Sequence, residues 1–180
     1  MKPNIITFNS YCDITNAVTE DNFLKIEGYA AHYNKPNLNS EIVNADSFNM
    51  FFNMYKSKEL EPVVNYEHSD TVLGDITEIV SKEDGLWISA RLNNDVKIVN
   101  EMLAPNILAG TLKKFSTEGI IYGGLDGIVV NEDDTYYVKN FLLTAVSIVR
   151  TPADPNASFS VKNYIEELKR KQSRPIIHLI

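Results

Sequence analysis

Apolar and polar residues alternate along most of the chain, a pattern typical of strands with one buried face. The alternation predicts a strand over residues 23–33, followed by a loop as far as residue 44. Helical spacing then replaces it, because the aromatic residues between 45 and 55 fall on one face, with Asp46 or Ser47 available as the cap. These aromatic residues are Phe48, Phe51, Phe52 and Tyr55.

The middle of the chain predicts a tight hairpin. Strands over residues 72–81 and 86–92 are joined by a short turn whose Asp84-Gly85 step suits positive φ angles. A further strand at 63–66 precedes this hairpin, and Asn93 or Asn94 then caps a helix that ends by Pro105 or Gly110.

The second half adds strands over residues 112–122, 127–131 and 136–149, so strands outnumber helices. We therefore expect an α+β fold built on a small, mostly antiparallel β-barrel or curved sheet, with two or three helices outside it. One domain is expected for 180 residues, with an N-terminal extension over 1–22, the folded domain over 23–161, and a helix and tail over 162–180.

Charge and composition exclude several classes of function. The net charge of −7 argues against a general binder of nucleic acid, although the last 19 residues are basic, with five Lys or Arg against two Glu. No stretch is long and apolar enough to span a membrane, and the start lacks the features of a secretory signal. Neither nucleotide-binding glycine motif occurs, and the lone Cys12 and three scattered histidines have no zinc spacing, so we expect no cofactor and no metal.

His68 is the first candidate for chemistry. It follows the strand over residues 63–66 and precedes the next, and loops anchored by strands often carry catalytic groups. Imidazole can take a hydroxyl proton near neutral pH and return it. On this segment alone, a structural or exposed histidine is the favoured interpretation.

Ser116 is the second candidate, in the middle of a β-prone run. Alternation places it on the same face as Glu118 and opposite Gly119, whose missing side chain would let another chain, such as a substrate strand, approach closely. A serine hydroxyl becomes a nucleophile only when a base removes its proton and N–H groups receive the oxyanion. Without His68, Ser116 is an ordinary strand serine.

Seven segments in the same order between residues 26 and 161 resemble the phage prohead (capsid maturation) serine proteases of the HK97 type, which share their fold with the herpesvirus assemblin proteases. They are EGYAAHY at 27–33, ADSF at 45–48, PVVNYEH at 62–68, LGDI at 73–76, GLWI at 85–88 with Arg91-Leu92, FSTEG at 115–119, and AVSIV at 145–149 continued by TPADPNA at 151–157.

The resemblance implies a serine endopeptidase in which Ser116 attacks the peptide carbonyl and His68 acts as general base and then acid. Many relatives carry a glutamate where this chain has Ala145, and alanine cannot orient an imidazolium. We rank Ser147, on the same strand face, first as a replacement, above Glu118 and Asp75. Arg150, at the end of this strand, is a candidate for oxyanion support.

The resemblance also implies the setting. Substrates would be scaffold and capsid proteins, and the enzyme itself, inside the assembling prohead in the host bacterial cytoplasm, with a homodimer as a further possibility. The expectation of no nucleic acid or membrane partner comes from the charge and hydropathy of the chain. Two alternatives stay open. Ala145 favours a catalytically silent, protease-like scaffold or assembly protein of the prohead, and an unrelated β-barrel binding module would place His68 and Ser116 on opposite sides of the fold.

Overall fold

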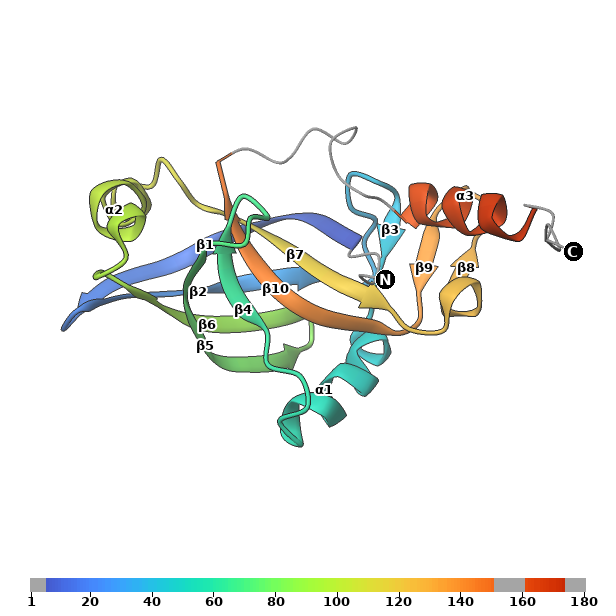
Figure 1. Cartoon of the computed structure of the whole chain (residues 1–180), viewed down its shortest axis with the longest axis horizontal. Helices are drawn as coiled ribbons and strands as arrows, with labels where there is room; N and C mark the ends of the chain where they lie inside the picture. The colour runs from blue at the N-terminus through green and yellow to red at the C-terminus, as the bar shows by residue number, and fades with distance from the viewer. Residues whose placement is uncertain (1–5, 151–160, 174–180) are drawn as a thin grey trace, which may run out of the picture.

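Seven strands close into a barrel in the computed structural model, which describes residues 6–150 and 161–173 (Figure 1). All neighbouring strands run antiparallel except β4 and β10, which are parallel. Around the barrel the order is β1 (Ile6–Glu20), β2 (Phe23–His32), β6 (Gly85–Asn93), β5 (Val72–Lys82), β4 (Val63–Tyr66), β10 (Phe141–Val149) and β7 (Lys114–Ile121), which pairs again with β1. This confirms the predicted fold class.

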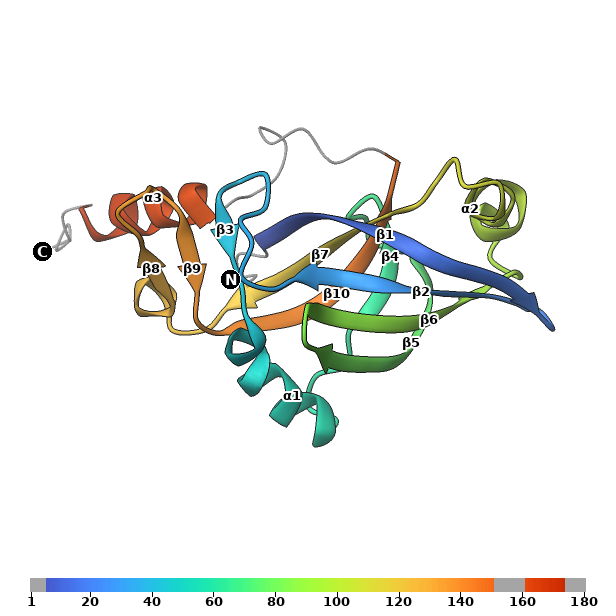
Figure 2. The ribbon, with the colours of Figure 1, turned by 180° about the vertical axis from the view of Figure 1, so that it is seen from behind.

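A small second sheet and short helices surround the barrel (Figures 1 and 2). The sheet contains β3 (Glu41–Ile42), β9 (Tyr136–Val138) and β8 (Ile128–Val130). The helical elements are η1 (Ala45–Phe48), α1 (Asn49–Lys56), the π-helical turn η2 (Val99–Leu103), α2 (Ala104–Leu108), η3 (Gly124–Gly127) and α3 (Val161–Gln172). Both views show α2 at one end of the long axis and α3, beside the small sheet, at the other.

Alternate residues of the strands fill the barrel and form its core. The fully buried side chains of at least Leu size include Leu24, Ile26, Ile88, Leu92, Phe115 and Ile148. Burying one such side chain contributes about 1.5–3 kcal/mol relative to leaving it exposed. The outward-facing positions of β4, β7 and β10 are therefore free to carry chemistry.

The predicted helix over residues 45–55 is present as η1 followed by α1. Its cap is Asn44 rather than Asp46 or Ser47, because the Ser47 N–H donates to Asn44 Oδ1 and the Asn44 N–H donates to Ser47 Oγ. Phe48 packs edge-on against Phe51 and Phe141, with ring centroids 6.5 and 5.9 Å away. The helix thereby holds the start of β10.

The hairpin between β5 and β6 lies where the sequence predicts it, with Lys82 opposite Gly85. The predicted positive φ at Asp84-Gly85 is wrong, since neither residue is among those with positive φ. Gly85 serves a different need, because a Cβ atom there would lie 2.1 Å from the carbonyl oxygen of Ala31 on β2.

The N-terminal residues differ most from the sequence prediction. Residues 6–20, expected to lie in an extension, form β1, which pairs with β2 and with β7 and so closes the barrel. Its many Asn, Ser and Thr residues hide the alternation, and Val18 is half exposed although it lies within the strand. The predicted strand over 136–149 is likewise two strands, β9 and β10.

Glu41 on β3 anchors the C-terminal helix. Its carboxylate is fully buried and accepts from the backbone N–H of Val161, the first residue of α3, at 2.6 Å and from Asn37 Nδ2 at 2.7 Å. Burial raises the pKa of Glu41 to about 7, although the hydrogen bonds from Val161, Asn37 and Asn39 lower it. Ionisation of the buried Glu41 carboxyl therefore destabilises the folded state.

We predict that Glu41→Gln removes part of the pH dependence of stability. In the folded protein the pKa of Glu41 is about 7, above the ordinary value of 4.5. The stability that protonated Glu41 contributes is therefore complete below pH 4.5 and is lost as the pH rises through 7. Urea unfolding at pH 5 and pH 8 should show a loss of about 2 to 3 kcal/mol in the wild type that is absent in the variant. Equal pH dependence in both proteins would contradict this, and Glu59→Gln, at an exposed glutamate, is the control.

Candidate active site

The candidate catalytic residues lie on the outer face of three neighbouring strands, β4, β10 and β7 (Figure 1). The pairing aligns Asn65, Ser147 and Ser116 in one row across these strands. The next row holds Val63, Ala145 and Glu118. Because alternate residues share a face, the two rows lie next to one another outside the barrel.

A β-bulge in β10 sets this alignment. The register between β10 and β7 shifts between Leu143 and Ala145, so that Thr144 is the extra residue, and its Oγ1 donates to the carbonyl oxygen of Glu118 at 3.2 Å. Bulges often occur beside active sites, where they redirect side chains. Here the bulge places Ala145 opposite Glu118 and Ser147 opposite Ser116.

A strained turn after β4 carries His68 over these rows. Glu67 and His68 have φ angles of +48° and +55°, and the N–H of Ser69 donates to the carbonyl of Tyr66 at 3.0 Å. Two positive φ angles at the centre of such a turn define type I′, which normally uses Asn and Gly. Each costs about 1–2 kcal/mol in a residue other than glycine, and such strain is concentrated at functional sites.

Asn65, Ser147, Glu118 and His68 form one hydrogen-bonded cluster. Asn65 Nδ2 donates to Glu118 Oε1 at 2.8 Å, and Ser147 Oγ contacts Asn65 Oδ1, Glu118 Oε1 at 2.8 Å and His68 Nδ1 at 3.0 Å. His68 Nδ1 lies 2.9 Å from Glu118 Oε1, and the backbone N–H of His68 donates to Ser147 Oγ at 3.2 Å.

The hydroxyl of Ser147 has one hydrogen and faces two acceptors, Asn65 Oδ1 and Glu118 Oε1. The amide nitrogen of Asn65 donates to the same Glu118 oxygen. Glu118 Oε1 then accepts from His68 Nδ1 as well as from Asn65. Every donor in the cluster has an acceptor, which makes the arrangement rigid.

The charge of Glu118 fixes the tautomer of His68. Burial raises the pKa of Glu118, but hydrogen bonds from His68, Asn65 and Ser147, together with the charge of His68, outweigh burial and lower it. An ionised carboxylate accepts only, so the ring proton of neutral His68 stays on Nδ1 and the lone pair is on Nε2. Nε2 is buried and has no hydrogen-bond partner among the residues that the structure describes. Its lone pair is therefore unused, and Ser116 Oγ makes no hydrogen bond with it in this structure.

Ser116 lies on β7, the strand that pairs with β10. It is 2% exposed and directly opposite Ser147, whose Oγ is 3.0 Å from the His68 ring. Directly opposite residues of antiparallel strands have Cβ atoms about 4.5–5.5 Å apart. Ser147 is therefore in contact with His68, and Ser116 lies opposite Ser147 on the adjoining strand.

The other predicted residues lie elsewhere. The guanidinium of Arg150 contacts Met102 Sδ at 3.2 Å and lies 5.8 Å from the ring of Tyr66, and no hydrogen bond in the described structure joins it to His68 or Glu118. Asp75 forms an exposed ion pair with Arg91 at 3.7 Å. His32 packs against Tyr29 at the end of β2, and His178 is outside the described residues.

Two members of the cluster were underestimated from the sequence. Glu118 was ranked below Ser147, although alternation already placed it on the face of Ser116, and both groups contact Nδ1. Asn65 was not singled out, and its only signal is a polar residue inside the buried run VVNY. The close approach expected at Gly119 is made by the chain's own strand β10, since a Cβ atom there would lie 2.5 Å from Leu142 O.

A cavity of about 460 Å³ opens beside the cluster. Its lining includes His68 and Glu118 as well as the small side chain of Ala145. Ala145 and His68 thus border the same cavity.

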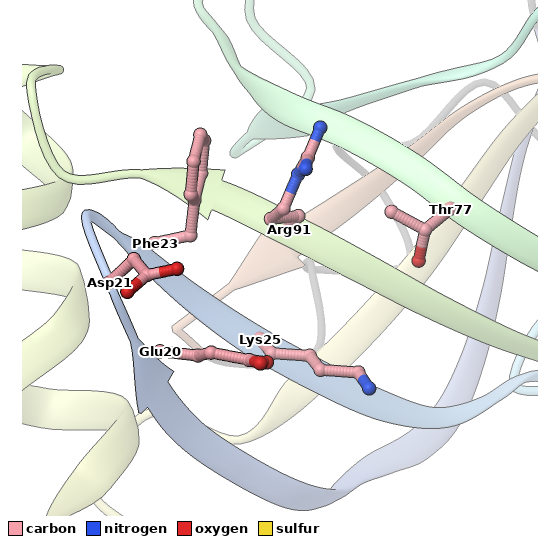
Figure 3. A pocket seen from close by; sticks show the side chains of 6 residues that line it. All are labelled: Glu20, Asp21, Phe23, Lys25, Thr77 and Arg91. Atoms are coloured by element: carbon pink, nitrogen blue, oxygen red, sulfur yellow. The ribbon is translucent and has the colours of Figure 1, made fainter.

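A second cavity, of about 320 Å³, lies far along the barrel near the turn between β1 and β2 (Figure 3). Arg91 lies over the ring of Phe23, 4.5 Å from its centroid, and Glu20, Asp21, Lys25 and Thr77 complete the lining. These residues include no base paired with a nucleophile, so this cavity is not the catalytic candidate. Within residues 6–150 and 161–173, no cluster of His, Cys, Asp or Glu is suited to a metal ion, and no helix has the length and hydropathy of a membrane span.

Comparisons with known proteins bear on the family and the fold. A family model described as caudovirus prohead serine protease matches residues 13–171. The solved structure of the bacteriophage T4 capsid assembly protease, gp21, superimposes with a TM-score of 0.63 at 16% identity, covering 84% of this chain and 100% of that one. At this identity the likeness is evidence for the fold. No curated protein sequence matches the chain.

Proposed function

The chain belongs to the caudovirus prohead serine protease family and is a protease of capsid maturation, and we propose that it uses Ser116 as nucleophile, His68 as general base and Glu118 as the carboxylate of the triad. The observation that carries the proposal is the contact between His68 Nδ1 and Glu118 Oε1 at 2.9 Å, which leaves Nε2 free to accept a proton. Ser116, in the adjoining strand, supplies the hydroxyl.

The reaction follows the acyl-enzyme route. Ser116 Oγ attacks the peptide carbonyl carbon while its proton passes to His68 Nε2, and Glu118 stabilises the imidazolium that forms. The tetrahedral intermediate collapses as the imidazolium gives its proton to the leaving amine, and the C–N bond breaks. Water, deprotonated by the same imidazole, then hydrolyses the ester and restores Ser116.

Ser147 and Asn65 hold the triad in place in this proposal. Ser147 accepts from the backbone N–H of His68, and Asn65 donates to Glu118. The hydroxyl of Ser147 contacts Asn65, Glu118 and His68 Nδ1, the ring nitrogen that carries the proton in this proposal and so cannot act as a base toward it. Ser147 is therefore a positioning residue rather than the nucleophile.

The substrates we propose are scaffold and capsid proteins, and the protease itself, within the assembling prohead. The structurally similar T4 protein is a capsid assembly protease, which supports this class of substrate. The alternative of a catalytically silent scaffold rests on Ala145. In our proposal Glu118, the cross-strand partner of Ala145, serves as the carboxylate in its place.

Co-expression with the scaffold and capsid proteins tests this function. We expect shortened forms of the substrates with the wild type and none with Ser116→Ala, while Ser89→Ala, at a buried serine of β6 outside the cluster, processes normally. Continued processing by Ser116→Ala would exclude it as nucleophile. Assembled shells without any processing by the wild type would favour the silent scaffold.

A further inference from the structure

Three hydrogen bonds donated by backbone N–H groups fix the turn that carries His68 to the end of β10. The N–H of Glu67 donates to the carbonyl of Ile148 at 3.1 Å, and the N–H of His68 donates to Ser147 Oγ at 3.2 Å. In the third bond the acceptor is a side chain of the turn itself, since the backbone N–H of Arg150 donates to Glu67 Oε1 at 2.8 Å. Each bond joins the strained turn to a different residue of β10 or the residue just after it.

The side chain of Glu67 is exposed, so burial does not explain why it turns back to the backbone. Its residue also adopts a φ of +48°, which only glycine takes without strain. If the Glu67 carboxylate did not accept from Arg150, Glu67 would be joined to β10 only by the hydrogen bond from its backbone N–H to Ile148. Negative φ angles are favoured for both Glu67 and His68, so the turn would then be held less firmly in its strained conformation. The imidazole, one residue further, would move with it.

Arg150 reinforces the clamp from its other side. Its guanidinium is engaged by Met102 Sδ at 3.2 Å and lies over the ring of Tyr66, the residue at which the turn begins. Arg150 is thus held through its backbone N–H by Glu67 and through its guanidinium by Met102 and Tyr66. We call the Glu67–Arg150 hydrogen bond, with the contacts of Arg150 to Met102 and Tyr66, the clamp. It joins the turn that carries His68 to β4, to the end of β10 and to the π-helical turn η2.

We propose that Glu67 is a positioning residue of the active site, which holds His68 in register with Glu118 and Ser116 by clamping the turn to the backbone of Arg150. This inference rests on the proposed function, in which His68 is the base. A displacement of about 1 Å in a catalytic group can cost a hundredfold in rate. Glu67 therefore acts on the reaction rate through the position of His68, and it does not touch the substrate.

Three variants distinguish the effect of the Glu67–Arg150 hydrogen bond from the effects of the negative charge and of the backbone strain in the turn. Glu67→Ala removes the acceptor, Glu67→Gln keeps a carbonyl acceptor without the charge, and Glu67→Gly removes both the acceptor and the φ penalty. Glu61→Ala, at an exposed glutamate just before β4, is the matched control for loss of one negative charge.

The experiment measures the rate of covalent labelling of the full chain by a fluorophosphonate probe. We expect the maximal labelling rate to fall about tenfold to hundredfold in Glu67→Ala and Glu67→Gly, with the probe concentration at half-maximal rate nearly unchanged. Glu67→Gln and Glu61→Ala should stay within about threefold of the wild type. Labelling of Glu67→Ala at the wild-type rate would overturn the proposal.

A proton NMR spectrum gives a readout that does not depend on which serine reacts. The Nδ1 proton of His68, shared with Glu118, should give a resolved low-field signal in the wild type and in Glu67→Gln that broadens or disappears in Glu67→Ala. A signal unchanged in Glu67→Ala would overturn the positioning role even if Ser116 proved not to be the nucleophile. Loss of labelling in Ser116→Ala with unchanged labelling in Glu67→Ala would leave the proposed function intact and remove Glu67 from it.

Discussion

Replacing Ser116 by alanine should lower the rate of peptide hydrolysis by about a millionfold, to the residual level that binding and oxyanion stabilisation give alone. The variant loses the only atom that forms the acyl-enzyme, and His68 has nothing to deprotonate except water. Because Ser116 is a small side chain on a strand, the fold should be unaffected, and thermal unfolding should give a melting temperature close to that of the wild type.

Ser147→Ala is the matched control, since it removes a buried hydroxyl from the neighbouring strand at the position directly opposite. It leaves the backbone N–H of His68 and Asn65 Oδ1 without their partner. We expect a loss of about tenfold to a hundredfold, because the base is displaced and not removed. If Ser147→Ala were the inactive variant and Ser116→Ala the active one, the roles of the two serines would be exchanged.

Removing the carboxylate of Glu118 should have the second largest effect. Glu118→Ala leaves His68 free to adopt the other tautomer and removes the charge that stabilises the imidazolium. Comparable changes in serine proteases lower kcat by about ten-thousandfold. Hydrolysis of a mapped cleavage-site peptide, with the melting temperature measured in parallel, separates this effect from the loss of the hydrogen bond to Asn65.

The register suggests a direct rescue of Glu118→Ala. Ala145 is the cross-strand partner of Glu118 and lines the same cavity as His68. A second substitution, Ala145→Glu, places a carboxylate on the opposite strand within reach of the same imidazole, and should restore a tenfold or greater part of the lost rate. Ala145→Gln in the same background has the size without the charge and should restore little. Equal activity of the two double variants would mean that charge at this place is unimportant.

The fold was predictable where alternation is strong. The buried faces of β2, β6 and β7 and the hairpin between β5 and β6 are visible as period-two patterns. β1 was missed because its polar residues look like a loop, and it becomes a strand only through pairing with β2 and β7, which local sequence does not encode. The tight approach at Gly85 likewise depends on a strand fifty residues away.

The candidate site was predictable in part. His68, Ser116 and Ser147 could be selected from motif order and strand alternation. The ranking of Glu118 below Ser147 depended on register, because only the bulge at Thr144 determines which residue of β10 faces Glu118. The positive φ angles at Glu67 and His68, and the clamp to Arg150, come from tertiary contacts that no local pattern announces.

The most direct test of the account is to identify the residue that a fluorophosphonate modifies, by mass spectrometry of peptides from the labelled full chain. The account predicts one adduct, on Ser116, which is lost when His68 is replaced by alanine. An adduct on Ser147, or unmodified Ser116 in a sample that cleaves its substrates, would contradict it.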